Sequence, residues 1–169
     1  MHKERNMTFT QTVDHSAIKT GQVLAIATLL GAFVLNRWEP IAILAGVFLI
    51  TGVFFEWGPF ALVYRWLLKP LGLVKPDLRT DNAQPHRFGQ AVGAASAALA
   101  AAALYYNYTT LGWVLVWVLI ALTGISFMGW CIGCFIYYQL NRFGLGGFFG
   151  HKPTDSNVIL GARPRRTID

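Results

Sequence analysis

The sequence predicts an all-α, polytopic membrane protein whose four transmembrane helices form two helical hairpins. Two observations support this prediction. Of the 169 residues, 54% are hydrophobic and only 13% are charged, whereas soluble domains usually carry about 25% charged residues. The chain also contains four apolar runs, at about 17–36, 41–57, 88–106 and 111–138. Roughly 20 apolar residues are enough to cross the core of a bilayer.

The first hairpin follows a polar N-terminal tail, residues 1–16. Asp14 is a candidate cap for the first helix, because a carboxylate can accept a hydrogen bond from an N–H group of the first turn. After the second span, Gly-Pro at positions 58–59 interrupts the helix, since proline lacks the backbone donor that a helix needs. We expect residues 60–68 to form an amphipathic segment at the membrane interface.

The second hairpin is predicted from two very different spans. Residues 91–103 are almost all alanine, glycine and serine, and small residues let helix backbones approach closely. We therefore place the third helix at the centre of the bundle. The fourth run, 111–138, is the longest apolar stretch, carries no charge and contains the only two cysteines, Cys131 and Cys134.

The basic residues predict the orientation of the protein. Of the 14 lysines and arginines, only Arg37 lies on the side opposite to the termini and the middle loop. Because cytoplasmic loops carry an excess of basic residues, we expect a bacterial inner-membrane protein with both termini in the cytoplasm. The membrane domain would be residues 17–143, followed by a flexible basic tail at 144–169. The net charge of +6 is explained in the same way, so nucleic acid is not an expected partner.

The pair Cys131 and Cys134 has the Cys-x-x-Cys spacing of thiol–disulfide catalysts. Such catalysts need a thiolate, which forms readily when the first cysteine stands at a helix N-terminus. If the helix ends at Gly129, Cys131 caps the next helix and becomes reactive. If the helix continues, the pair is buried in apolar surroundings that raise the thiol pKa, and the cysteines serve packing beside Gly129 and Gly133.

Several polar residues are predicted to support the cysteines from the same membrane face. His86 and Arg87 stand at the mouth of the third span, where a cationic Arg87 beside Cys131 would favour the thiolate. His86 is also the one candidate for a third metal ligand, but two thiolates supply only half of a tetrahedral site, and no metal is predicted. Glu56, in an apolar setting at the end of the second span, is either a partner for Arg87 or Arg65 or an interfacial carboxylate that lipid headgroups solvate.

A short internal repeat in the sequence adds two glutamines to this set. The first span opens with a base, one residue, Gly and Gln at 19–22, and the third span opens with the same pattern at 87–90. A parallel repeat of two helical hairpins would explain this match. Gln22 and Gln90 would then occupy equivalent places at the cytoplasmic mouth of the bundle.

Three elements of the sequence resemble a known bacterial family of integral membrane proteins, domain of unknown function 4395. They are the Val-Asp opening at 13–14, Pro-His-Arg-Phe-Gly-Gln at 85–90 and Cys-x-Gly-Cys at 131–134. The resemblance covers about 13–142 and implies a four-span membrane protein. It implies no established activity, only an association of some members with rhodanese-like or thioredoxin-like partners.

Two functions follow from these features. In the first, the cysteines exchange disulfides or carry sulfur at the cytoplasmic membrane face, together with a cytosolic thiol or sulfurtransferase protein. In the second, the chain is an accessory subunit that packs against another membrane protein or a second copy, and its cysteines are structural. The lipid bilayer is a partner in both cases, and the sequence indicates no particular cofactor.

Overall fold

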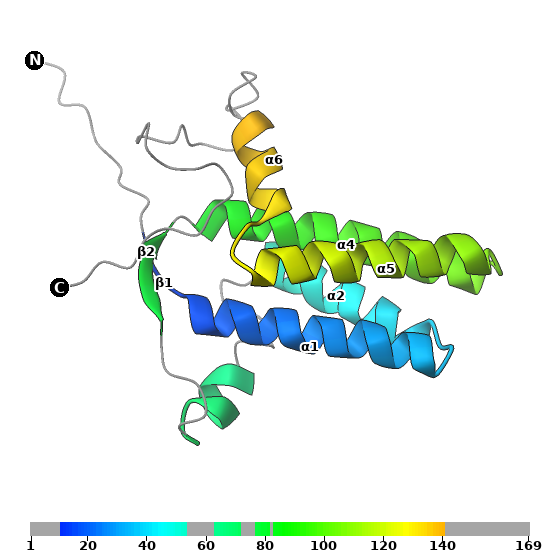
Figure 1. The fold of residues 1–169 in the computed structure, drawn as a ribbon, viewed down its shortest axis with the longest axis horizontal. Coiled ribbons are helices and arrows are strands. Elements are labelled where there is room, and N and C mark those ends of the chain that lie inside the picture. Colours follow the sequence, from blue (N-terminus) through cyan, green and yellow to red (C-terminus); the bar gives the residue numbers. More distant parts are fainter. Residues whose placement is uncertain (1–10, 54–62, 72–76, 82, 141–169) are drawn as a thin grey trace, which may run out of the picture.

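A computed structural model of the chain describes residues 11–53, 63–71, 77–81 and 83–140. Within these ranges the chain forms helices and one pair of short strands (Figure 1). In chain order the elements are β1 (Gln11–Asp14), α1 (His15–Val34), α2 (Glu39–Val53), η1 (Tyr64–Leu68), β2 (Leu78–Asp81), α4 (Ala83–Tyr105), α5 (Thr109–Phe127) and α6 (Ile132–Leu140). Glu56 lies outside the described residues.

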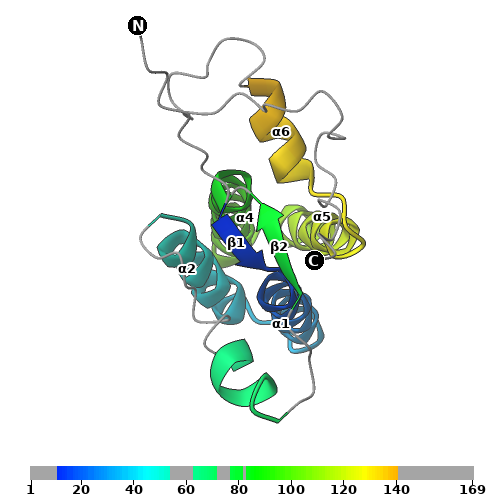
Figure 2. The ribbon, with the colours of Figure 1, turned by 90° about the vertical axis from the view of Figure 1, so that its left-hand side faces the viewer.

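Four helices, α1, α2, α4 and α5, run along a common direction and form a bundle (Figures 1 and 2). Helix α4 packs against α2, α5 and α6, and α1 packs against α2 and α5. The small residues of α4 allow these close contacts, because Ala97 and Ala100 are fully buried between the helices. This agrees with the central position that the alanine-rich composition predicts.

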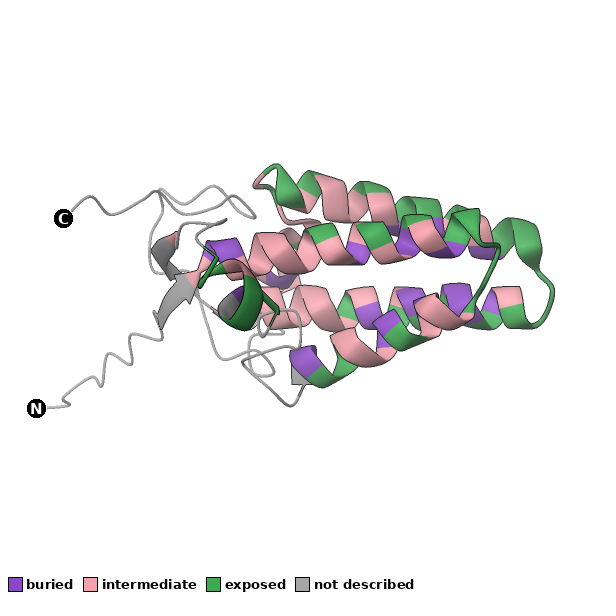
Figure 3. Cartoon of the chain, turned by 90° about the horizontal axis from the view of Figure 1, so that it is seen from below, coloured by how far each residue is buried: buried purple, intermediate pink, exposed green. Residues whose placement is uncertain are grey.

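The outer surface of the bundle is apolar. Buried residues recur along the helix sides that face each other, and exposed residues along the outer sides (Figure 3). Large hydrophobic side chains are among the most exposed, including Val34, Ile43 and Leu99 at 79%, 69% and 65%. Three helices, α1, α4 and α5, are long and apolar enough to cross a membrane, whereas the described part of α2 has 15 residues. Contact with a lipid bilayer explains such a surface.

The polar segments before α1 and α4 are joined by strands that the sequence did not predict. Strands β1 and β2 pair antiparallel, with Gln11 opposite Asp81 and Asp14 opposite Leu78. The polar tail predicted for 1–16 is therefore a strand from residue 11, and α1 already begins at His15. Each strand has only four residues, too few for a period-two pattern to stand out, and their pairing is a long-range contact.

Asp14 connects three elements at this end of the bundle. Its carboxylate accepts hydrogen bonds from the backbone N–H of Ser16 at 3.0 Å, as the predicted N-cap, and from the backbone N–H of Asp77 at 3.2 Å. The hydroxyl of Tyr64 donates to the same carboxylate at 2.8 Å. Tyr64 is buried, whereas its neighbour Trp66 is 80% exposed. The described part of the predicted interfacial segment is thus a short π-helix, η1, held to the bundle by Asp14.

The apolar run 111–138 is divided between two helices, and its interpretation as one span is corrected here. Helix α5 ends at Phe127, the backbone turns at Gly129, and α6 begins at Ile132. Helix α6 leaves the direction of the bundle (Figure 1). It packs against α4 at two glycines, since a Cβ atom on Gly133 would lie 2.7 Å from the Cα of Gly89.

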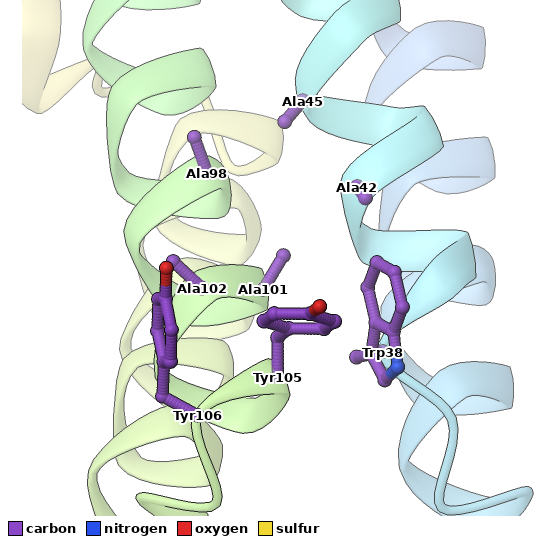
Figure 4. A pocket seen from close by; sticks show the side chains of 8 residues that line it. All are labelled: Trp38, Ala42, Ala45, Ala98, Ala101, Ala102, Tyr105 and Tyr106. Atoms are coloured by element: carbon purple, nitrogen blue, oxygen red, sulfur yellow. The ribbon is translucent and has the colours of Figure 1, made fainter.

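The opposite end of the bundle holds the turns between paired helices and an aromatic cluster. Trp38 and Tyr105 meet edge to face with ring centroids 5.2 Å apart. Beside them an open groove of about 420 Å³ lies between α2 and α4 (Figure 4). Its lining is Trp38, Ala42, Ala45, Ala98, Ala101, Ala102, Tyr105 and Tyr106. The groove is apolar and lies at the end of the bundle that does not carry the cysteines.

Replacing Asp14 by alanine should lower the free energy of unfolding by about 2 kcal/mol, because the N-cap and the bonds to Tyr64 and Asp77 are lost together. Thermal unfolding of the protein in detergent measures the change. Glu39→Ala is the control, because that carboxylate is exposed to solvent and forms an ion pair with Arg37 at the surface. Equal unfolding midpoints for the two variants would contradict the role of Asp14.

Gly133→Ala should destabilise the protein by about 1–3 kcal/mol, because the added methyl group meets the backbone of Gly89 and no side chain can move aside. Gly124→Ala on α5 is the matched control, since nothing lies within 4 Å of a Cβ there, and helix propensity alone favours alanine. Denaturant unfolding in detergent compares the two. A Gly133→Ala protein as stable as the control would show that α6 does not pack closely on α4.

Candidate functional site

The backbone between α5 and α6 places Cys131 at a helix N-terminus. Gly129 has φ 109°, a left-handed conformation that glycine adopts without steric cost. The carbonyl of Cys131 accepts the first hydrogen bond of α6 from the N–H of Phe135 at 3.0 Å. Its sulfur accepts from the N–H of Cys134 at 3.3 Å. Cys131 therefore acts as the N-cap, which is the first of the two alternatives left open by the sequence.

These contacts favour the thiolate of Cys131 and lower its pKa from about 9 to about 6. The largest cause is a hydrogen bond from the Cys134 side chain, and the N–H of Cys134, the nearby charge of His86 and a hydrogen bond from Ser126 add to it. Burial opposes the shift. No disulfide joins Cys131 and Cys134 in this structure. Cys131 is partly exposed, whereas Cys134 is 5% exposed, so the thiol with the lowered pKa is also the accessible one.

Helix α4 brings a histidine to the second cysteine. The Nδ1 atom of His86 lies 3.8 Å from the sulfur of Cys134. His86 stands three residues before Gly89, on the same face of α4, so the glycine contact with Gly133 also holds the histidine in place. The ring of His15, at the start of α1, meets that of His86 edge to face at 5.9 Å. No cluster of three metal-ligating residues occurs within the described parts of the chain.

The remaining predicted residues divide between the cysteines and α2. Gln22 donates to the hydroxyl of Ser126 at 2.8 Å, in the last turn of α5. Arg87 instead donates from Nε to the carbonyl of Gly52 on α2 at 3.1 Å. Gln90 also faces that glycine, because a Cβ on Gly52 would lie 3.3 Å from the Cβ of Gln90. The basic group that acts on Cys131 is thus His86, and the two glutamines are not equivalent.

Ser126 is the residue that sequence reasoning missed. Its hydroxyl accepts a hydrogen bond from the amide of Gln22 at 2.8 Å, and it adds to the lowering of the Cys131 pKa. A serine five positions before a cysteine has no fixed meaning in a helix, because residues five apart do not share a face. Only the turn at Gly129 brings Ser126 and Cys131 together. The one available signal was a hydroxyl near the end of a long apolar run.

Comparison with known proteins identifies the family of the chain. No curated protein and no solved structure matches the chain. A family model matches residues 13–142, which is more than half of the chain. This match includes the second half of β1, all of β2, the bundle and the cysteine pair described above. The chain therefore belongs to the family described as a domain of unknown function, DUF4395.

Proposed function

We propose that this protein is a membrane thiol–disulfide oxidoreductase in which Cys131 is the attacking thiolate and Cys134 the resolving thiol. The observation that carries the proposal is the position of Cys131 as the N-cap of α6, with its sulfur accepting the N–H of Cys134. A cysteine at a helix N-terminus is stabilised as the thiolate. With its pKa lowered to about 6, Cys131 is mostly ionised at pH 7.

The reaction begins when the thiolate of Cys131 attacks one sulfur of a disulfide in a cytosolic protein. The disulfide bond of the partner breaks, its second sulfur leaves as a thiolate, and a mixed disulfide with Cys131 forms. Cys134 gives its proton to the thiolate that has left the partner and attacks the sulfur of Cys131. The mixed disulfide breaks and the Cys131–Cys134 disulfide forms. Two electrons pass from the pair to the partner. One partner thiolate takes the proton of Cys134, and the other takes a proton from water, which replaces the one that Cys131 released when it ionised.

The proposed setting is a bacterial inner membrane crossed by α1, α2, α4 and α5, with both termini in the cytoplasm. The starts of α1 and α4 and the end of α5 share the end of the bundle that carries the cysteines (Figure 1). Lys19 lies there, with its ammonium group 5.6 Å from the ring centroid of Phe127. Arg37 lies at the other end, paired with Glu39. Placing the cysteine end inside the cell agrees with the excess of basic residues on that side.

An accessory role in a membrane complex is the second candidate. It is favoured by the groove between α2 and α4, whose five alanines would let a helix of another membrane protein, or of a second copy, approach closely (Figure 4). In a membrane, helices gain no hydrophobic free energy by associating, because lipid tails are as apolar as their side chains. Close packing of small residues favours association instead. In this case the cysteines would serve only the packing of α6 on α4.

Disulfide exchange separates the two candidates. Purified protein incubated with oxidised glutathione should form the Cys131–Cys134 disulfide and release two molecules of reduced glutathione. Cys134→Ser should stop at a glutathione adduct on Cys131, and Cys131→Ser should react at least about tenfold more slowly, because the thiolate-stabilising contacts of the N-cap are lost. Intact-protein mass spectrometry follows both products. Slow reaction at similar rates in all three proteins would favour the accessory role.

The topology should be visible in reporter fusions. A green fluorescent protein fused to the C-terminus should fluoresce, whereas alkaline phosphatase at the same site should be inactive, because the enzyme needs the oxidising periplasm for its disulfides. Insertion of each reporter at Asn107, in the turn between α4 and α5, should give the opposite pair of results. Active alkaline phosphatase at the C-terminus would place the cysteines outside the cytoplasm and overturn this orientation.

A further inference from the structure

We propose that helix α6 and the turn before it form a surface that lies on the lipid bilayer and holds the cysteine pair at the level of the lipid headgroups. This inference rests on the membrane setting of the proposed function and deepens it, since it names the partner that covers α6. The occupant of the surface is lipid and not a second protein. A disulfide partner of Cys131 must then react at the membrane surface.

The direction of α6 is the first observation. Helices α1, α2, α4 and α5 run along a common direction, whereas α6 points across it and leaves the bundle beside α4 and the end of α5 (Figures 1 and 2). With the bundle crossing the bilayer as proposed, α6 lies along the membrane plane. A helix in this orientation at the end of a span meets the lipid–water interface, where one side can contact lipid while the other faces water.

The exposed side chains of this segment are apolar. Met128, in the turn after α5, is 88% exposed, and Trp130 and Ile136 are each 39% exposed. The ring of Trp130 lies against α6, with its centroid 5.7 Å from that of Phe135. Tryptophan favours the headgroup region, because its ring is apolar and its N–H group can still reach water. Exposed apolar side chains that gather in this way indicate a surface that a partner covers.

Lipid fits this surface because the segment is uncharged and continues the outer side of the bundle. No residue from 121 to 140 carries a charge, so the segment offers no charge complementarity to a soluble protein. On α5, Val118 and Ile125 are exposed on the side chains' outer face and lead along the helix to Met128. The apolar surface of α6 is therefore continuous with the surface that lipid covers on the bundle.

The depth of the segment follows from Lys19. Its ammonium group lies 5.6 Å from the ring centroid of Phe127, the last residue of α5. A lysine near the end of a membrane helix extends its charge to the headgroups while its methylene groups stay in apolar surroundings. Phe127 therefore lies close to the headgroup level, and Met128 follows it directly. Cys131, at the start of α6, lies at the same level.

The test measures collisions of nitroxide spin labels with oxygen, which dissolves in lipid, and with a nickel chelate, which stays in water. Labels are attached to Met128→Cys and, separately, Ile136→Cys in a Cys131→Ser/Cys134→Ser chain. The full chain is studied in vesicles of phosphatidylcholine and phosphatidylglycerol. Serine at position 131 is itself a favoured N-cap, so this background keeps the start of α6. Two separate positions keep the inference testable if one variant does not fold.

Two exposed positions serve as matched references in the same background. Leu99→Cys, on the outer side of α4, reports lipid, and Arg37→Cys, in the turn between α1 and α2, reports water. The ratio of oxygen to nickel collisions at positions 128 and 136 should lie clearly above the ratio at position 37 and should not exceed that at position 99. Ratios as low as at position 37 would overturn the inference, because the segment would lie in water.

Few collisions with either reagent would also overturn it, since protein and not lipid would then cover α6. The labelled chains lack Cys131 and Cys134, so the result does not depend on disulfide exchange. If the wild type exchanges disulfides but the labels report water, the proposed function stands and the membrane surface fails. If the labels report lipid but the wild type exchanges no disulfide, the membrane surface stands and the proposed function fails.

Discussion

The chemistry of this site depends on the interruption of a helix. In a continuous helix, the N–H of Cys134 would be bonded to the carbonyl of residue 130 and could not meet a sulfur. The left-handed turn at Gly129, with φ 109°, ends one helix and starts another, so the first N–H groups of α6 lack helical partners. Cys131 is placed where it satisfies one of them. The same geometry that completes the helix end also stabilises the negative charge of a thiolate.

The bundle then supplies what the short helix α6 lacks. Its nine residues could not form a stable helix alone, and α4 supports them through the contact between Gly89 and Gly133. That contact is close enough to bring His86 to Cys134. Helix α1 contributes Gln22 and is itself fixed at its start by Asp14. The two glycines therefore serve packing and chemistry together, because the close approach of the α4 and α6 backbones positions His86 beside Cys134.

Small residues lie inside the bundle and large ones on its outside. Alanines of α4 fill the centre of the bundle, and large hydrophobic side chains cover its outside. In water, the exposed hydrophobic side chains would cost free energy. In lipid they do not, and the favourable free energy of helix association comes from the close packing of small residues. The polar and charged contacts are concentrated at the helix ends, where Asp14, Lys19 and the Arg37–Glu39 pair lie.

Local patterns in the sequence were enough to predict the apolar helices, the cap at Asp14 and the pairing of two cysteines near one end of the bundle. They could not decide where the last apolar run breaks. Gly124 and Gly129 are both glycines in that run, yet Gly124 stays helical with open space around it and Gly129 turns.

By itself, the sequence determined which residues are apolar, how long each run is and how the two cysteines are spaced, because these properties belong to neighbouring positions. Only the tertiary structure decided that β1 pairs with β2, that Arg87 turns to α2 and that Gln22 meets Ser126. Each of these contacts joins segments that come together only when the helices pack or the chain turns between them, and no periodicity along the chain encodes such a meeting.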